Sequence, residues 1–201
     1  MNRWLMLGLL VCACGTDNPN NNIPDGGGAG SGSISGTVGG QPLVVKDAVF
    51  AFDGNVVIVL VADRANICQL LASTTLPGTT TALLMSIANF VPPATVNPHV
   101  TGDYTFFPVS QTNQPSTAGL YWYGEFDVVD TSCAATANHV ATAGTMSITQ
   151  TGSSSGTHLK ANLSGVQFGT DTLNGTFDAS YCPVLANSSC GNLIARPPAT
   201  E

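Results

Sequence analysis

The sequence is poor in charged residues, and cations are especially few. Asp, Glu, Lys and Arg make up 8% of the 201 residues, and five Lys and Arg stand against twelve Asp and Glu, a formal net charge of −7. Nucleic acids are bound by clustered Lys and Arg, because each neutralised phosphate releases counterions. Beyond the N-terminus the cations lie far apart, at Lys46, Arg64, Lys160 and Arg196. We therefore expect no nucleic-acid partner.

Histidine is also scarce, and the sequence lacks the usual catalytic and metal-binding patterns. His99, His139 and His158 have no metal-ligand spacing to one another, to cysteine or to a carboxylate. Residues 152–156 spell Gly-x-Ser-x-Gly, but a nucleophile elbow needs a strand-to-helix turn, and strand patterns flank this segment on both sides. We expect a hairpin turn there, and no metal, cofactor or catalytic residue.

The first apolar run, Trp4 to Val11, is too short to cross a bilayer, which takes about 20 helical residues. It follows a segment with one positive charge and leads into Val11-Cys12-Ala13-Cys14. A small residue directly before a cysteine at the end of such a run resembles the lipobox of bacterial lipoproteins. The resemblance implies that Cys14 becomes the N-terminus, carries fatty acyl groups such as palmitate, and makes the membrane a partner through this anchor.

Cleavage before Cys14 makes residues 1–13 the signal peptide. The alternatives are secretory cleavage after Ala13 without lipid, cleavage before Cys12, and an uncleaved membrane anchor. The number of cysteines favours the lipoprotein, because four remain to pair once Cys12 is removed and Cys14 is lipidated. Gly15 follows the lipidated cysteine, and in the lipoproteins it resembles an aspartate there favours the inner membrane. The resemblance therefore implies the bacterial cell envelope and, within it, the outer membrane.

The four remaining cysteines are expected to form two disulfides. Zinc sites use closely spaced pairs, whereas the gaps here are long except between 182 and 190. An exported protein also lies in an oxidising compartment. Of the three connectivities that four cysteines allow, the order of the expected strands favours Cys68–Cys182 with Cys133–Cys190.

The segment 14–32, with the lipidated cysteine at its start, is expected to be a flexible tether. It has no periodic apolar pattern and is rich first in Asn and then in Gly. At about 5–6 Å × √n, such a coil has an r.m.s. reach of about 24 Å, enough to hold a domain clear of lipid headgroups. Residues 33–201 are then the length of a single ordinary domain.

From residue 33 onward, apolar and polar residues alternate with period two, the pattern of half-buried strands. Strands are expected at 43–52, 56–62, 81–91, 104–109, 118–129, 144–151, 157–168 and 173–181. A change of phase at Ser164-Gly165 indicates a bulge, and the last three strands should form a meander. One short helix is expected at 63–71, with Asp63 as its N-cap.

These elements predict an all-β fold. Turn sequences at regular intervals, such as Asp53-Gly54-Asn55, favour an antiparallel two-sheet β-sandwich of about eight to ten strands with one short helix. A closed barrel is the alternative, which alternation separates poorly from a sandwich.

The strand at 118–129 carries the candidate binding surface. Alternation directs Leu120, Trp122, Phe126 and Val128 inward, and the outward residues are Tyr121, Tyr123, Glu125 and Asp127. Aromatic rings stack on sugars, and carboxylates accept hydrogen bonds from hydroxyls. The strip is therefore a candidate site for a carbohydrate or protein ligand. Alternatively, the tyrosines pack under a loop or a second layer.

The sequence favours a lipid-anchored cell-envelope protein with a non-enzymatic binding or structural role, whose ligand and oligomeric state stay open. The alternative is a secreted, glycosidase-like hydrolase whose site is not recognisable in the sequence. Glu125 and Asp127 are two carboxylates on one strand face, which a glycosidase could use as acid and nucleophile, but solvated strand residues far outnumber catalytic ones. Catalysis would place more polar residues together near strand ends than this sequence shows. We therefore expect the protein not to be an enzyme.

Overall fold

The computed structural model describes residues 30–73, 75–96, 100–108 and 115–187. The strands are β1 (Ser31–Ser35), β2 (Thr37–Val38), β3 (Gln41–Pro42), β4 (Asp47–Asp53), β5 (Val56–Ala62), β6 (Thr80–Val91), β7 (Ala94–Val96), β8 (Gly102–Phe106), β9 (Gly119–Val129), β10 (Ala135–Val140), β11 (Ala143–Gln150), β12 (His158–Phe168) and β13 (Asp171–Tyr181). The helices are α1 (Ile67–Leu71) and the 3₁₀ turn η1 (Leu185–Asn187). Neither has the length and apolar character to cross a membrane.

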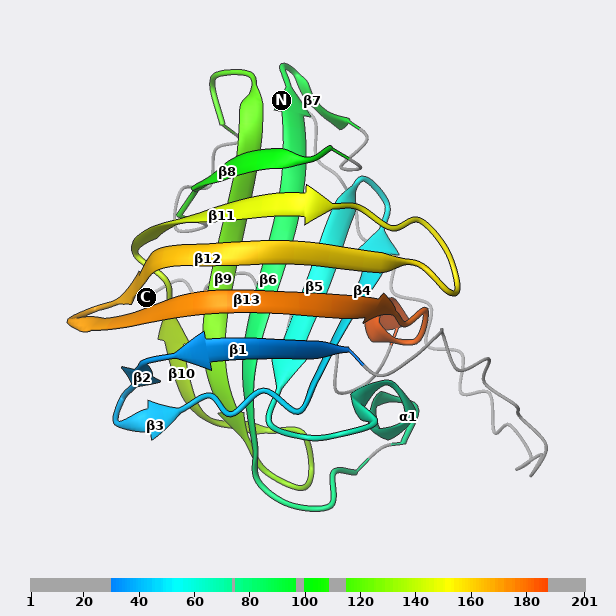
Figure 1. Ribbon diagram of the computed structural model, residues 1–201, viewed down its shortest axis with the longest axis vertical. Coiled ribbons are helices and arrows are strands. Elements are labelled where there is room, and N and C mark those ends of the chain that lie inside the picture. Colours follow the sequence, from blue (N-terminus) through cyan, green and yellow to red (C-terminus); the bar gives the residue numbers. More distant parts are fainter. Residues whose placement is uncertain (1–29, 74, 97–99, 109–114, 188–201) are drawn as a thin grey trace, which may run out of the picture.

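Eight of these strands close into a barrel. Their order is β9-β8-β11-β12-β13-β4-β5-β6, and β6 pairs with β9 to complete the circle. In Figure 1 the strands β8, β11, β12 and β13 run across β9, β6, β5 and β4 behind them. The prediction of an all-β chain is correct, but the predicted antiparallel two-sheet sandwich is wrong.

Two kinds of pairing cause the closure. The antiparallel ladder between β6 and β9 runs from Thr80 opposite Val129 to Phe90 opposite Gly119. Two short parallel pairings, β13 with β4 and β8 with β9, then join the two layers. A strand buries one face in a sandwich and in a barrel alike, so its alternation is the same in both. The pairings between distant strands make the difference, and they leave no periodic signal.

Most of the local strand predictions are confirmed. β5 occupies the predicted range, and β11, β12 and β13 form the expected antiparallel meander. The register between β12 and β13 shifts between Leu163 and Val166, where Gly165 has a φ of 59°. This left-handed conformation favours glycine, so the predicted bulge lies where the alternation changes phase. β1 begins at Ser31, so the folded domain starts slightly before residue 33.

The helix is shorter than predicted, and Asp63 is not its N-cap. Asp63 Oδ1 accepts a hydrogen bond from the Thr81 N–H at 3.0 Å. The N–H of Ile67, at the start of α1, donates instead to Asp47 Oδ2 at 3.0 Å. Asp47 is 3% exposed, and its Oδ1 accepts the N–H groups of Gly30 and Ala48, both at 2.8 Å. A buried carboxylate distant in sequence therefore replaces the local cap.

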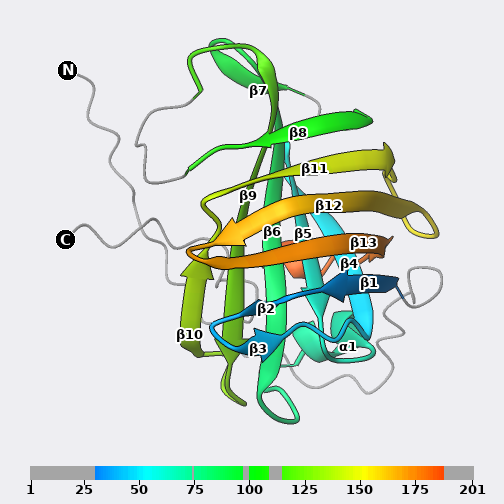
Figure 2. The same cartoon turned by 60° about the vertical axis from the view of Figure 1, so that its left-hand side comes forward.

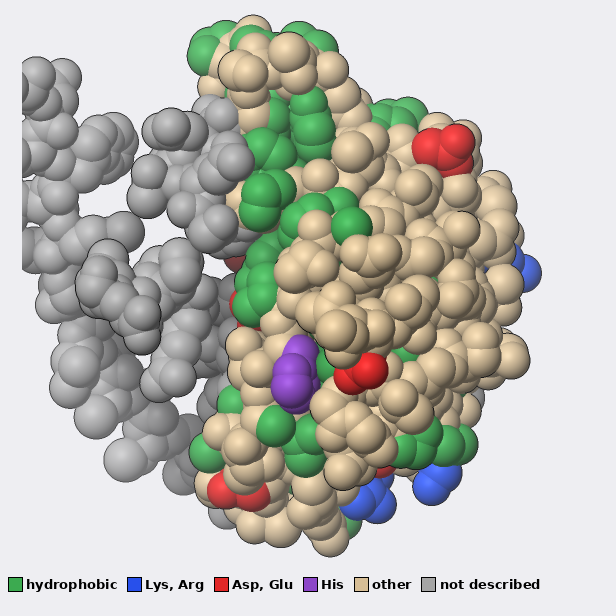
Figure 3. All heavy atoms as spheres, turned by 90° about the vertical axis from the view of Figure 1, so that its left-hand side faces the viewer, with side chains coloured by type: hydrophobic (Ala, Val, Ile, Leu, Met, Phe, Trp, Pro, Cys, Tyr) green, Lys and Arg blue, Asp and Glu red, His purple; other side chains and the backbone are tan. Residues whose placement is uncertain are grey.

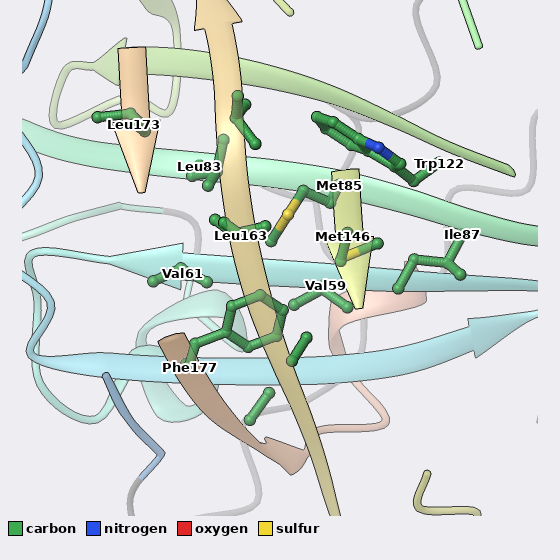
Figure 4. Close-up of a cluster of buried hydrophobic side chains, with 14 of the residues drawn as sticks. Val59, Val61, Leu83, Met85, Ile87, Trp122, Met146, Leu163, Leu173 and Phe177 are labelled. Atoms are coloured by element: carbon green, nitrogen blue, oxygen red, sulfur yellow. The ribbon is translucent and has the colours of Figure 1, made fainter. Parts of the chain in front are cut away.

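Side chains fill the interior of the barrel. The largest that are fully buried include Trp122, Tyr104, Phe50, Phe126 and Met146. Figure 4 shows Val59, Leu83, Met85 and Phe177 meeting between the two layers. An eight-stranded barrel has an interior just wide enough to be filled in this way. The described part of the barrel is therefore packed as a core.

A second apolar cluster lies on the outer face of β4, β5 and β6, where α1 and η1 cover it. Cys68, on α1, forms a disulfide with Cys182, directly after β13, with a Cα–Cα distance of 5.7 Å. The predicted Cys68–Cys182 pair is therefore confirmed. Cys133 is also disulfide-bonded. Its predicted pairing with Cys190 stays a prediction, because Cys190 lies outside the described residues, as does Cys14.

Candidate functional site

The candidate strip lies on the outer face of β9, which pairs with β6 along one side and, along the other, with β8 at Tyr121 and with β10 from Glu125 onward. In Figure 2 β10 runs beside β9 at the edge of this layer. Tyr121, Tyr123 and Glu125 are half-buried, whereas Asp127 is only 3% exposed. The strip is therefore not the open row of side chains that alternation suggests.

Three of these residues form a hydrogen-bonded network with Asn138 of β10. The Tyr123 hydroxyl donates to Glu125 Oε1. Asn138 Nδ2 donates to Glu125 Oε2 at 3.1 Å and to Asp127 Oδ1 at 2.6 Å. We call Tyr123, Glu125, Asp127 and Asn138 the carboxylate network. Sequence reasoning missed Asn138, because residues 135–140 lack the alternation that identifies a strand.

Burial changes the acidity of this network. It raises the pKa of Asp127 to about 6, and the negative charge of Glu125 adds to the effect. The hydrogen bond from Asn138 and the proximity of His139 act in the opposite direction. The pKa of Tyr123 is also raised, first by burial and then by its hydrogen bond to Glu125. Asp127 therefore gains or loses its proton closer to neutral pH than an ordinary aspartate does.

Tyr121 is held separately from the network. Its ring meets the ring of Phe107 edge-on, with centroids 5.5 Å apart. Its hydroxyl lies 2.9 Å from Thr117 Oγ1 and donates to the Thr117 carbonyl at 3.1 Å. Residues from both sides of the connection between β8 and β9 thus pack on Tyr121. This arrangement matches the alternative in which a tyrosine packs under neighbouring chain.

A second candidate site lies on the outer face of β1, β11, β12 and β13. A surface cavity of about 210 Å³ is lined there by the outward side chains of Ser31, Thr149, Lys160, Asn162, Thr176 and Asp178. We call it the polar groove. Its members alternate with core residues on the consecutive strands β11, β12 and β13, and β1, which is distant in sequence, adds Ser31. Alternation marks those on β11 to β13 only as solvent-facing, and Ser31 lies in the segment predicted to be a tether, so sequence reasoning did not single them out.

An ion-pair cluster borders the polar groove. Lys160 Nζ lies 3.1 Å from Asp178 Oδ2, and His158 Nδ1 lies 2.5 Å from Asp178 Oδ1. His158 therefore stands at the start of β12 against a carboxylate. The preceding segment, 152–156, is the predicted turn between β11 and β12, in which Thr157 Oγ1 accepts the N–H groups of Ser153 and Ser154.

Within the described ranges, no group of three or more His, Cys, Asp or Glu side chains is placed to hold a metal ion. Charged side chains are also sparse on the face drawn in Figure 3, where polar and backbone atoms dominate. Comparisons with protein-family models, curated proteins and solved structures find no match to this chain. Its function must therefore be inferred from its own residues.

Proposed function

We propose that the protein is a lipid-anchored, non-enzymatic binding module of a bacterial cell envelope, in which lipid on Cys14 holds the barrel at the outer membrane. The observation that carries the binding role is the packed interior of the barrel. Because side chains occupy the space where larger barrels hold ligands, recognition falls to the outer surface. The Cys68–Cys182 disulfide supports an exported location, since disulfides persist in oxidising compartments.

The outer surface offers two polar sites for a ligand. On β9 the carboxylate network presents Glu125 and Asn138, while Tyr121 is held by its own neighbours. On the other layer of the barrel, the polar groove on β1, β11, β12 and β13 presents short hydroxyl and amide side chains. α1 and η1 cover the outer face of β4 to β6. A ligand is therefore expected on β9 or on the layer of β11 to β13.

The geometry of the two carboxylates argues against the glycosidase alternative. A retaining glycosidase needs its carboxyl groups on either side of the scissile bond, with access to the sugar. Here a single nitrogen of Asn138 contacts both Glu125 and Asp127, so an amide occupies the space between them. Asp127 is also buried. A raised pKa by itself does not make Asp127 a general acid, because proton transfer needs contact with substrate.

The anchor is tested by metabolic labelling with a fatty acid, followed by membrane fractionation. Cys14→Ser is expected to abolish labelling and membrane attachment. Cys12→Ser is the matched control and should keep both, because Cys12 leaves with the signal peptide. Label that persists on the Cys14→Ser protein would refute the lipid anchor.

The binding role is tested with the purified full-length protein in detergent micelles. Its retention on arrays of bacterial polysaccharides and on whole cells is measured. Binding without chemical change to the ligand is expected. Turnover of any arrayed polysaccharide would contradict the non-enzymatic role.

A further inference from the structure

The polar groove is built from side chains that the sheet places in rows. Lys160 lies opposite Asp178, which lies opposite Ser31, and one step along the strands Asn162 lies opposite Thr176. Directly opposed residues of antiparallel strands project on the same side of the sheet. Figure 1 shows β12, β13 and β1 adjacent in this order. The rows therefore face the same ligand space, and rigid strands hold them in place.

The charges at the polar groove are already balanced. Both oxygens of the Asp178 carboxylate are engaged, one by Lys160 Nζ and the other by His158 Nδ1. An anionic ligand would compete with Asp178 for Lys160 and would be repelled by the carboxylate. A cation would find the carboxylate occupied. The charge pattern therefore favours a neutral ligand.

The neutral side chains of the groove are free to bind. Among the residues that the structure describes, the side chains of Asn162, Thr176 and Ser31 make no hydrogen bond to another residue. An amide supplies two donors and an acceptor, and each hydroxyl supplies a donor and accepts as well. Only Thr149 is engaged, through a hydrogen bond from Oγ1 to the Lys160 carbonyl at 3.3 Å. The groove thus presents donors and acceptors mixed over a short distance.

We propose that the polar groove binds one ring of a neutral saccharide. Adjacent sugar hydroxyls each donate and accept, which complements the mixed groups of Asn162, Thr176 and Ser31. A groove of about 210 Å³ has room for roughly one such ring, and it is smaller than the sites of drug-sized ligands, which begin at about 300 Å³. The proposal rests on the binding role proposed above and names its ligand class. A repeating polymer would gain strength from several weak contacts.

The test uses the full-length protein in detergent micelles and saturation-transfer NMR. The probes are methyl glycosides of glucose, mannose, galactose and N-acetylglucosamine, neutral oligosaccharides of the same sugars, and glucuronic acid as a charged comparator. At least one neutral probe should bind, with a dissociation constant on the order of 1 mM for a single ring. Oligosaccharides that bind more tightly than the single ring would identify a polymer as the source.

Asn162→Ala is expected to weaken this binding at least tenfold, because it removes the central amide. The matched control is Gln167→Ala, an exposed outer-face residue of the same strand that lies outside the groove, and it should change the affinity less than twofold. Both positions are exposed, and circular dichroism checks that both variants fold.

The proposal is overturned if no neutral probe binds, if Asn162→Ala binds as well as the wild type, or if glucuronic acid binds more tightly than every neutral probe. These results leave the lipid anchor at Cys14 untouched, since labelling tests it independently. Release of free sugar or methanol from a bound glycoside would instead contradict the non-enzymatic role.

Discussion

Replacing Asp127 by Asn should stabilise the protein, and the gain should depend on pH. Asp127 is 3% exposed, and its pKa rises from 3.8 to about 6. Each pKa unit corresponds to about 1.4 kcal/mol, so ionised Asp127 costs the folded state up to about 3 kcal/mol at pH 8. The carbonyl oxygen of Asn at this position can still accept the hydrogen bond that Asn138 donates to Asp127. The substitution therefore removes the buried charge and keeps the contact.

The sign of the effect follows from proton binding. Between pH 4 and 6 the folded state holds a proton on Asp127 more firmly than the unfolded state does. The contribution of Asp127 to the free energy of unfolding of the wild type is therefore lost as the pH rises through about 6. Urea unfolding of wild type and Asp127→Asn should give nearly equal free energies at pH 4. As the pH rises, the free energy of unfolding of Asp127→Asn should exceed that of the wild type by a growing amount, up to about 3 kcal/mol at pH 8.

Asp103→Asn is the control, because Asp103 is an exposed outward residue of β8. Its effect should stay within about 0.5 kcal/mol at every pH. A difference between wild type and Asp127→Asn that does not vary with pH would refute the reasoning, as would a variant less stable than wild type at pH 8.

Three further changes probe the fold. Asp47→Ala should lower the free energy of unfolding by about 3 kcal/mol or more, because it leaves three backbone N–H groups without their acceptor; urea unfolding measures this, and a loss below about 1 kcal/mol would contradict it. Replacing Cys68 and Cys182 together by Ala should cost about 4–5 kcal/mol, since the disulfide closes a loop with a sequence separation of 114; an unchanged denaturation midpoint would show that the disulfide is dispensable. Gly175→Ala should displace β1, because the new Cβ would lie 2.0 Å from the Ser33 carbonyl oxygen. Gly156→Ala has open space around it and should lower the free energy of unfolding by only about 1 kcal/mol. Hydrogen exchange at β1 compares the two variants, and equal protection of β1 in both would contradict the prediction.

Most of the longer strands were predictable because each buries at least one face in a core, whereas β1 and β10 were missed. Val56 to Ala62 is apolar on both sides, and β5 is in fact buried from inside the barrel and from the α1 side. The closure was not predictable, because it depends on pairings such as Ser180 opposite Val49, which connect segments that are distant in the chain. Two residues of parallel pairing carry no pattern of their own.

The start of the helix and the candidate site on β9 both differ from what the sequence predicts, and for a related reason. Asp63 precedes an apolar pattern of helical spacing, as an N-cap would, but its carboxylate is used by Thr81 on the neighbouring strand β6. Likewise, Glu125 and Asp127 are recognisable from alternation, whereas the burial of Asp127 and its link to Asn138 come from the pairing of β10 with β9. Local pattern locates side chains on a face, and tertiary pairing decides which of them meet.

The connection at Gly30 also has a mechanical consequence. Asp47 Oδ1 accepts a hydrogen bond from the Gly30 N–H directly before β1, and among the strands that the structure describes β1 pairs with β13 alone. A pull on the chain ahead of Gly30 therefore loads this hydrogen bond first and then the β1 ladder. The eight strands of the closed circle do not include β1. The Cys68–Cys182 disulfide links α1 covalently to the end of β13. A force that detaches β1 therefore leaves the eight-stranded barrel and this disulfide intact.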